Sequence, residues 1–202
     1  MANRKLGAKT PLLLAALLFS TLGIVILAGC GGESGEGEVS EPTAVGEASE
    51  QPEATEQLEA APDFELPLFG NANYTAGDTL TLSELEGRPI VLNFWFPSCP
   101  PCVAEMPDLD ASFQEHKDVG LAFIGVQLIG VDSEQNGQEF VDRLGVTYAL
   151  GPDRDGEIAF QKYEVQGFPT TFFLNADHGI VRKWSGPLNR EKLEELVAEI
   201  LP

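Results

Sequence analysis

Apolar residues are distributed unevenly along the 202-residue chain and divide it into three regions. Residues 1–30 have a basic start followed by an apolar stretch, whereas residues 31–62 contain almost no large apolar side chain. Residues 63–202 alternate between short apolar runs and segments in which apolar residues recur at helical spacing. Only the third region can bury a hydrophobic core, so it is predicted to be the folded domain.

Apolar spacing within 63–202 predicts strands and helices in alternation. Ile90 to Phe96 is a continuous apolar and aromatic run, as expected of a central strand that is buried on both faces, and 121–129 is a second such run. Asp155 and Asn189 are the cap residues expected to begin two of the helices. The predicted strands are 64–69, 79–82, 90–96, 121–129, 147–150, 170–174 and 180–184. The predicted helices are one turn capped by Ser83, 100–116 with a bend at Pro107, 133–144, 155–163 and a final helix after Asn189.

The order of these elements is βαβ, followed by a helix, a hairpin and a last helix. The hairpin turn, residues 175–179, has the sequence Asn-Ala-Asp-His-Gly, which is typical of turns. This order predicts an α/β fold in which a mixed central sheet is flanked by helices on both faces.

The first thirty residues have the layout of an export signal. Arg4, Lys5 and Lys9 form a basic start, and Pro11 to Ala28 form the apolar stretch. Such a signal keeps its positive charge on the cytoplasmic side of the membrane. We therefore expect everything after residue 30 to lie outside the cytoplasm.

The apolar stretch ends in Leu27-Ala28-Gly29-Cys30, which resembles the lipobox of bacterial lipoproteins. In that family the peptide before the cysteine is cut off, and the cysteine becomes a lipid-carrying N-terminus. The resemblance therefore implies lipidation of Cys30. The alternative is an uncleaved transmembrane helix, because a span needs about 17–25 residues. Both interpretations attach the chain to the membrane.

The chain is acidic, with a formal net charge of −20 at pH 7. Residues 31–62 hold nine Glu and no Lys or Arg, and their composition predicts a disordered linker. The domain at 63–202 keeps 23 acidic residues against nine Lys and Arg, a net charge of −14. Such a surface repels nucleic-acid phosphates, so no nucleic-acid partner is expected, and solubility alone accounts for the charge.

The chain contains three cysteines, of which Cys99 and Cys102 form a Cys-Pro-Pro-Cys motif and Cys30 stands alone. A disulfide that closes a loop of only two residues adds little stability to a fold, so the pair is interpreted as a reactive site and not as a structural crosslink. It follows a buried strand and opens a helix, whose N-terminus favours a thiolate at Cys99. Pro100 and Pro101 sit where a missing N–H costs little. Cys102, one turn later, is expected to resolve a mixed disulfide formed at Cys99.

A zinc site is the weaker interpretation of the cysteine pair. Tetrahedral zinc needs two more ligands, and the two histidines of the chain, His116 and His178, do not fall in a zinc-finger spacing. Both histidines are expected to be ordinary surface residues. We therefore predict neither a metal site nor a cofactor.

Three segments resemble the TlpA/ResA/CcmG group of membrane-tethered thioredoxin-like proteins. Residues 93–107 (Asn-Phe-Trp-Phe-Pro-Ser-Cys-Pro-Pro-Cys-Val-Ala-Glu-Met-Pro) are similar to its active-site segment, 167–174 (Gly-Phe-Pro-Thr-Thr-Phe-Phe-Leu) to its cis-proline loop, and 61–66 to its opening. The resemblance covers residues 61–202. It implies the thioredoxin fold with an N-terminal β extension and a central insertion at about 133–150.

The same resemblance implies a thiol–disulfide oxidoreductase. Its substrates would be disulfides in exported proteins, with apocytochrome c during haem attachment as one candidate. Its electrons would come from a membrane donor of the CcdA/DsbD kind. The sequence itself does not determine the redox direction, because a reductant and an oxidant use the same two sulfurs.

The resemblance also assigns roles to residues outside the cysteine pair. Pro169 would form a cis peptide bond facing the cysteines, and the backbone of Phe168 would pair with an extended substrate peptide. Glu105 would accept the proton of Cys102 when that thiol must attack. The alternatives are an ordinary trans proline and a solvated helix glutamate. Ser98 departs from the family, which usually has Trp beside the first cysteine.

Two other functions share part of the pattern. A peroxiredoxin-like peroxidase resembles a Thr-x-x-Cys pattern in which the Thr holds peroxide near the thiol, but Phe96 occupies that place here. A thioredoxin-fold carrier could bind Cu(I) through the two sulfurs, which suit that ion. Both remain alternatives to disulfide reduction.

Overall fold

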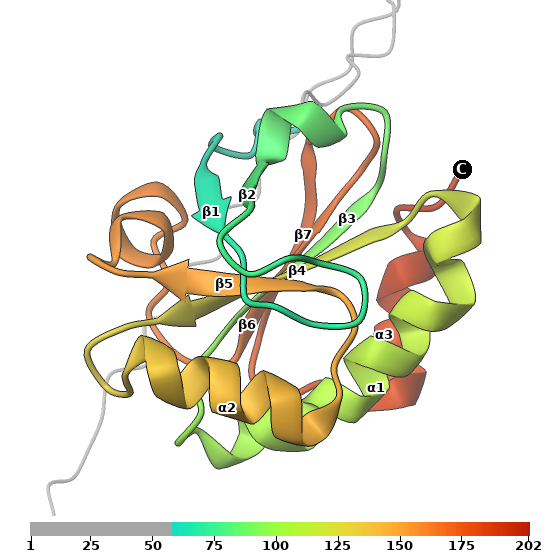
Figure 1. Ribbon diagram of the computed structural model, residues 1–202. Coiled ribbons are helices and arrows are strands. Elements are labelled where there is room, and N and C mark those ends of the chain that lie inside the picture. Colours follow the sequence, from blue (N-terminus) through green and yellow to red (C-terminus); the bar gives the residue numbers. More distant parts are fainter. Residues whose placement is uncertain (1–57) are drawn as a thin grey trace, which may run out of the picture. The chain divides into compact units, whose positions relative to one another are not determined.

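A five-stranded mixed sheet organises residues 58–202, the part of the chain that this computed structural model describes (Figure 1). The strands are β1 (Glu65–Pro67), β2 (Thr79–Thr81), β3 (Ile90–Trp95), β4 (Ala122–Leu128), β5 (Ala149–Asp153), β6 (Thr170–Leu174) and β7 (Ile180–Ser185). The helices are η1 (Leu82–Leu85), α1 (Pro100–His116), η2 (Lys117–Val119), α2 (Glu134–Leu144), η3 (Glu157–Lys162) and α3 (Arg190–Ala198). The strand order in the sheet is β5-β4-β3-β6-β7, and β1 pairs separately with β2.

The strand directions confirm the predicted mixed sheet. β3 runs parallel to β4, and β4 parallel to β5, whereas β6 is antiparallel to both β3 and β7. β3 is the central strand, and all six of its residues are buried. α2 and β5 together form the predicted central insertion, and β1 and β2 form the N-terminal β extension.

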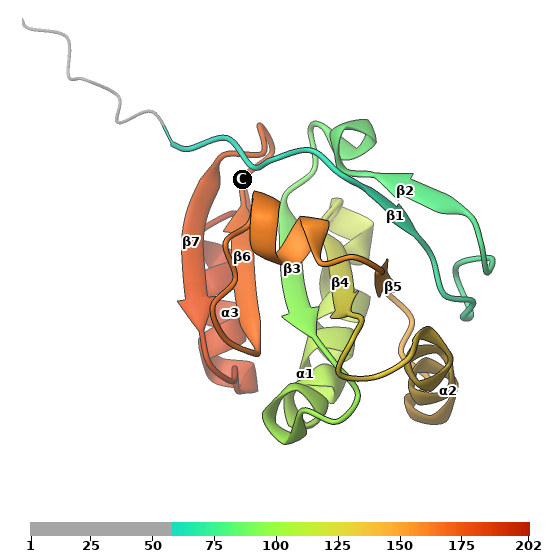
Figure 2. The same cartoon turned by 90° about the vertical axis from the view of Figure 1, so that its left-hand side faces the viewer.

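The side chains of β3 alternate between two hydrophobic cores, one on each face of the sheet. Val91 and Trp95 pack in the core beneath α1, α2 and α3, which also contains the two cysteines of the motif. Ile90, Leu92 and Phe94 pack in the core beneath β1, η1 and η3. Figure 2 shows η3 in front of the strands and α1 and α3 behind them. The long helices therefore cover one face, and short helices with the β extension cover the other.

β5 spans Ala149–Asp153 rather than the predicted 147–150. Thr147 lies outside the strand because its N–H donates to Asp110 Oδ1 at 2.7 Å. The strand continues through Pro152 because β5 is an edge strand, where a missing N–H leaves no neighbouring strand unpaired. A Cβ atom on Gly151 would lie 2.0 Å from the carbonyl oxygen of Pro67, so only glycine lets β1 pack this closely on β5.

Two of the predicted helix caps are wrong and one is confirmed. Ser83 lies inside η1, and its Oγ donates to Asp63 Oδ2 at 2.8 Å instead of capping the turn. η3 is a π-helix that begins after Gly156, which has a φ of 73°, so Asp155 is not its cap. The side chain of Asn189 caps α3 as predicted, whereas Ser133, predicted as the first residue of its helix, is instead the cap of α2.

The folded domain includes residues 59–62, which the composition assigns to the linker. Ile180 N–H donates to the Glu59 carbonyl at 2.8 Å, and Ala61 N–H donates to the His178 carbonyl at 2.9 Å. Tyr163 Oη donates to the carbonyl of the next residue, Pro62, at 2.8 Å. Figures 1 and 2 both show this segment at the end of the sheet opposite the start of α1. The chain therefore enters the domain far from the cysteine motif.

The predicted signal or anchor at 1–30, including Cys30, and nearly all of the predicted linker lie outside the described residues. Within residues 58–202, no helix is sufficiently long and apolar to cross a bilayer. Lipidation of Cys30 therefore stays a prediction from the sequence.

Candidate active site

The cysteine motif lies where β3 ends and α1 begins. Cys99 is the N-cap residue of α1, and its Sγ accepts a hydrogen bond from Cys102 N–H at 3.3 Å. The two sulfurs form a disulfide, and the Cα atoms are 5.3 Å apart. Cys102 is fully buried, whereas Cys99 is 4% exposed and lies between two exposed residues, Ser98 and Pro100. An external thiol or disulfide can therefore reach Cys99 but not Cys102.

Glu105, one turn after Cys102 on α1, is a buried carboxylate and not a solvated helix residue. Only 2% of it is exposed. Its Oε1 accepts a hydrogen bond from Asn93 Nδ2 at 2.8 Å, and its Oε2 accepts one from Leu188 N–H at 2.8 Å. Burial raises the pKa of Glu105 to about 7, although the two hydrogen bonds oppose this shift. The carboxyl can therefore gain and lose a proton near neutral pH.

Asn93 connects this carboxylate to the sheet. Its Nδ2 also donates to Thr171 Oγ1 at 3.0 Å, so one amide group joins β3, α1 and β6. Its Oδ1 is buried and accepts no hydrogen bond from the described residues. The sequence did not indicate the contacts of Asn93, Thr171 or Leu188 in this network.

The loop before β6 completes the site. The Phe168–Pro169 peptide bond is cis, which confirms the isomer that the sequence predicts. Phe168 is half-buried against the core that contains Cys99 and Cys102, and its ring centroid lies 5.3 Å from that of Phe96. The backbone carbonyl of Phe96 in turn accepts a hydrogen bond from the N–H of Cys99 at 3.1 Å. Phe96 therefore connects the cis-proline loop to the cysteine motif. The role of Phe168 and Pro169 in peptide binding stays a prediction.

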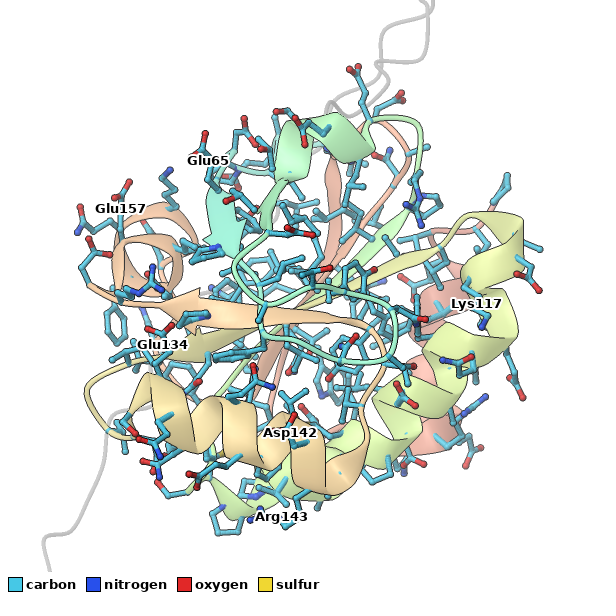
Figure 3. The ribbon with its side chains drawn as sticks, in the orientation of Figure 1. Glu65, Lys117, Glu134, Asp142, Arg143 and Glu157 are labelled. Atoms are coloured by element: carbon cyan, nitrogen blue, oxygen red, sulfur yellow. A yellow bond between two sulfur atoms is a disulfide. The ribbon has the colours of Figure 1, made fainter. Side chains whose placement is uncertain are left out.

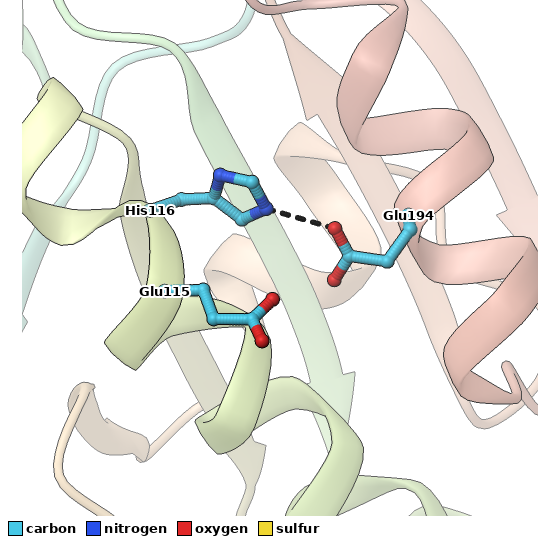
Figure 4. Close-up of side chains that lie close together, drawn as sticks. All are labelled: Glu115, His116 and Glu194. Atoms are coloured by element: carbon cyan, nitrogen blue, oxygen red, sulfur yellow. Dashed lines mark hydrogen bonds and ion pairs between the residues drawn. The ribbon is translucent and has the colours of Figure 1, made fainter.

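Glu115, His116 and Glu194 form the one group of His, Cys, Asp and Glu side chains within residues 58–202 that is close enough to hold a metal ion (Figure 4). His116 Nε2 lies 2.8 Å from Glu194 Oε2. The Arg190 guanidinium pairs with both glutamates, so a cation already offsets part of the group's negative charge. This cluster lies at the far end of α1 and joins it to α3. It does not involve the cysteine motif.

A helix N-terminus that presents one reachable cysteine, a buried partner thiol, a buried carboxylate and a neighbouring cis-proline defines a thioredoxin-fold thiol–disulfide oxidoreductase. The protein belongs to that class. More specifically, the chain belongs to the AhpC/TSA family, whose model matches residues 58–183.

Individual relatives agree with this assignment. The chain is 33% identical over 144 residues to the thiol-disulfide oxidoreductase ResA of Oceanobacillus iheyensis. The matched residues make up 71% of this chain and 72% of the relative. It is 32% identical to the sporulation thiol-disulfide oxidoreductase A of Bacillus subtilis, over 56% of this chain and 69% of the relative. A thiol:disulfide interchange protein of Chlorobium tepidum has the same fold, with a TM-score of 0.62 at 22% identity over 72% of this chain and 98% of that one.

The raised pKa of Glu105 predicts a specific dependence of stability on pH. Between pH 4.5 and about 7 the folded protein holds a proton on Glu105 that the unfolded chain releases, so this group lowers stability as the pH rises. Glu105→Gln has no titrating group at this position, so its stability does not fall in this way. As the pH rises across this window, the free energy of unfolding of Glu105→Gln should increase relative to that of the wild type by about 2–4 kcal/mol, at about 1.4 kcal/mol per pKa unit.

Urea unfolding of the oxidised proteins at pH 5 and pH 8 measures this difference. Glu84→Gln, on the exposed side of η1, is the matched control. If the glutamine amide fits imperfectly, the free energy of unfolding changes by the same amount at both pH values, so the difference between them is unaffected. Parallel pH profiles for Glu105→Gln and the wild type would contradict the raised pKa.

Proposed function

We propose that this thiol–disulfide oxidoreductase acts outside the cytoplasm, is tethered to the membrane by its N-terminus, and reduces disulfides in exported proteins. The observation that carries the proposal is the asymmetry of the cysteine pair. Cys99 keeps a small exposed fraction, 4%, at the start of α1 between two exposed residues, while Cys102 one turn later is fully buried. This arrangement suits one thiol that meets the substrate and a second that releases it.

The reaction is an exchange of two electrons between dithiol and disulfide. The Cys99 thiolate attacks one sulfur of the substrate disulfide, forms a mixed disulfide and expels the other substrate sulfur as a thiolate. The Cys102 thiolate then attacks Cys99 Sγ, forms the disulfide seen in this structure and releases the second substrate thiol. One substrate disulfide is reduced while two protein thiols are oxidised. A donor dithiol must reverse the exchange before the next cycle.

Glu105 is the proposed base for the second step. Cys102 is fully buried, so solvent does not readily take its proton. Glu105 lies three residues later on the same side of α1, and its pKa of about 7 is suited to accepting a proton near neutral pH. The hydrogen bonds from Asn93 and Leu188 hold its carboxylate in place.

Phe168 and Pro169 are the proposed binding site for the substrate backbone. Pro169 has no N–H, so an extended peptide beside the disulfide would pair with the backbone of Phe168. The contact between the rings of Phe168 and Phe96 supports this role, because it holds the loop next to Cys99.

The tether and the partners rest on the sequence. Leu27-Ala28-Gly29-Cys30 supports a lipid anchor, with an N-terminal transmembrane helix as the alternative. An export signal places the domain where disulfide-containing exported proteins are found. Apocytochrome c is the specific substrate that we propose, and the electron donor is a membrane protein of the CcdA/DsbD kind.

Peroxide reduction is the less favoured alternative. The pattern for that chemistry places a threonine hydroxyl three residues before the reactive cysteine. Phe96 occupies this position, and its ring packs against Phe168 at 5.3 Å, which leaves no hydroxyl there to hold a peroxide.

The order of the two cysteines gives a direct test. Cys102→Ser should accumulate a mixed disulfide with oxidised insulin through Cys99, because the resolving thiol is absent. Cys99→Ser should accumulate almost none, because its remaining thiol is buried. Nonreducing gels and mass spectrometry of the adducts measure both. Trapping by Cys99→Ser but not by Cys102→Ser would reverse the assignment.

The role of Glu105 is tested by separating the two steps. Glu105→Gln should leave formation of the mixed disulfide nearly normal and slow its resolution by about 100-fold or more, since a general base typically contributes about 10²- to 10⁴-fold. Stopped-flow rates from pH 5 to 9 measure both steps, with Glu84→Gln as the control. If Glu105 acts only as a like charge, resolution in Glu105→Gln will be as fast or faster.

The tether has its own test. Protein isolated from membranes should begin at a lipid-modified Cys30, so its mass should correspond to residues 30–202 plus lipid. Cys30→Ala should not receive the lipid. An unmodified Cys30, or a chain that retains Met1, would show that the anchor is not a lipid.

A further inference from the structure

Ser98, the residue before Cys99, is held by a carboxylate from a different part of the chain. Its N–H donates to Asp132 Oδ2 at 2.8 Å, and its Oγ donates to the same oxygen at 2.7 Å. The two residues are 34 positions apart in the sequence. The carboxylate of Asp132 therefore lies one residue away from the thiol that meets the substrate.

The position of Asp132 is set by the connection between β4 and α2. Gly130, with a φ of 115°, turns the chain at the end of β4, and Asp132 forms an isolated bridge with Ile129. The next residue, Ser133, caps α2 in a reciprocal pair of hydrogen bonds with Asn136. Asp132 is thus fixed between a strand end and a capped helix, so its contact with Ser98 is defined by the fold.

The negative charge of Asp132 has no ion-pair partner among residues 58–202. A groove of about 200 Å³ lies beside it and is lined by Pro97, Ser98, Asp132, Asn136, Glu139, Phe140 and Arg143. Arg143 is the one cation of this lining, and its guanidinium lies 5.0 Å from the ring centroid of Phe140. Glu139 adds a second negative charge, and Glu105 lies on the buried side of the motif. Carboxylates therefore outnumber cations in the groove beside Ser98.

The start of α1 offers few hydrogen-bond donors to offset this charge. A helix N-terminus normally presents four free N–H groups. Pro100 and Pro101 occupy the first two helical positions and have no N–H, so Cys102 N–H is the donor that contacts Cys99 Sγ. The helix dipole favours a thiolate at Cys99, and Asp132 opposes it.

We propose that Asp132 is a positioning residue of the dithiol centre: it holds Ser98 and places an unpaired negative charge beside Cys99 that opposes ionisation of the thiol. This inference rests on the proposed function and concerns how the same site is tuned. A thiolate that is less stabilised is a stronger nucleophile and gives up electrons more readily when it forms a disulfide. Asp132 therefore biases the ionised dithiol toward reduction of its substrates.

Asp132→Asn tests this proposal, because the amide oxygen can still accept from Ser98 while the charge is lost. The control is Asp118→Asn, which removes the same charge from an exposed residue in η2. Asp118 lies next to Lys117, at the end of the 17-residue helix α1 away from Cys99, so it is about 25 Å from the thiol and is screened by salt (Figure 3). Both variants are made in the full chain.

Two quantities are measured from pH 5 to 10. The first is the pKa of Cys99, from the rate of its alkylation by iodoacetamide. The second is the equilibrium with dithiothreitol, in which two dithiothreitol thiols are oxidised as the Cys99–Cys102 disulfide is reduced. Asp132→Asn should lower the pKa of Cys99. It should raise the alkylation rate of Cys99 at pH 7 by about threefold to tenfold, as expected when one nearby charge is removed.

The equilibrium has a signature that a purely structural role would not produce. Removing the charge stabilises only the thiolate form of Cys99, so at pH values below the pKa of Cys99 the fraction of reduced protein should not change. At pH values above this pKa, the equilibrium constant with dithiothreitol should shift toward the reduced protein by the same roughly threefold to tenfold as the acid dissociation constant of Cys99. Asp118→Asn should match the wild type throughout.

Ser98→Ala separates the charge from the hydrogen bond. It removes the hydroxyl, but the Ser98 backbone N–H can still hold the carboxylate, so Cys99 should keep nearly its wild-type acidity. A shift as large as that of Asp132→Asn would overturn the charge proposal, as would identical curves for Asp132→Asn and Asp118→Asn. If Asp132→Asn does not fold, Asp132→Ser takes its place. A wild type that fails to reduce insulin would contradict the proposed function and leave the Asp132 measurements valid.

Discussion

Burial of one carboxylate, Glu105, is the constraint on which the active-site end of the domain depends. A buried charge is costly unless its oxygens are hydrogen-bonded, and both oxygens of Glu105 have a partner. One partner is Asn93 on β3, and the other is the backbone of Leu188, in the connection between β7 and α3. Since Asn93 also binds Thr171 on β6, a single carboxylate links α1 to the sheet and to the C-terminal part of the chain. α1 is thereby held in the orientation that places Cys99 between the exposed residues Ser98 and Pro100.

The chemistry of Cys99 results from opposing electrostatic effects at the start of α1. The helix dipole and Cys102 N–H favour the thiolate. Two prolines remove other donors, and the carboxylates of Asp132 and Glu105 oppose negative charge on the sulfurs. The motif alone is compatible with either redox direction. If Asp132 acts as proposed, the balance of these neighbours favours a reductant and is set mainly by residues outside the motif.

The two faces of the sheet serve different purposes. The face beneath α1, α2 and α3 carries the cysteines and the buried acid. The other face is closed by β1, η1 and η3, and hydrogen bonds from Tyr163 and Ile180 hold the incoming chain at Pro62 and Glu59. This attachment and the start of α1 lie at opposite ends of the sheet (Figure 2).

The sequence by itself determined most of the elements and the centre of the site. Ile90–Trp95 and Ala122–Leu128 are buried strands because continuous apolar runs require cover on both faces, and α1 begins at the Cys-Pro-Pro-Cys motif because prolines are suited to a first turn. The cis bond at Pro169 was implied by the resemblance of residues 167–174 to a cis-proline loop, and the structure has it. These features depend on residues that are close together along the chain.

Only the tertiary structure decided the features that depend on distant residues. Glu105 could have been a solvated helix residue until its contact with Leu188, 83 positions away, showed that it is buried. Ser83 and Asp155 have the character of helix caps, but Ser83 binds Asp63, and η3 begins after Gly156. The contact of Asp132 with Ser98 left no pattern in the sequence, because a single pair of polar residues has no period. Local periodicity determines which segments form helices and strands, whereas burial and charge at a site depend on which distant segments the fold brings together.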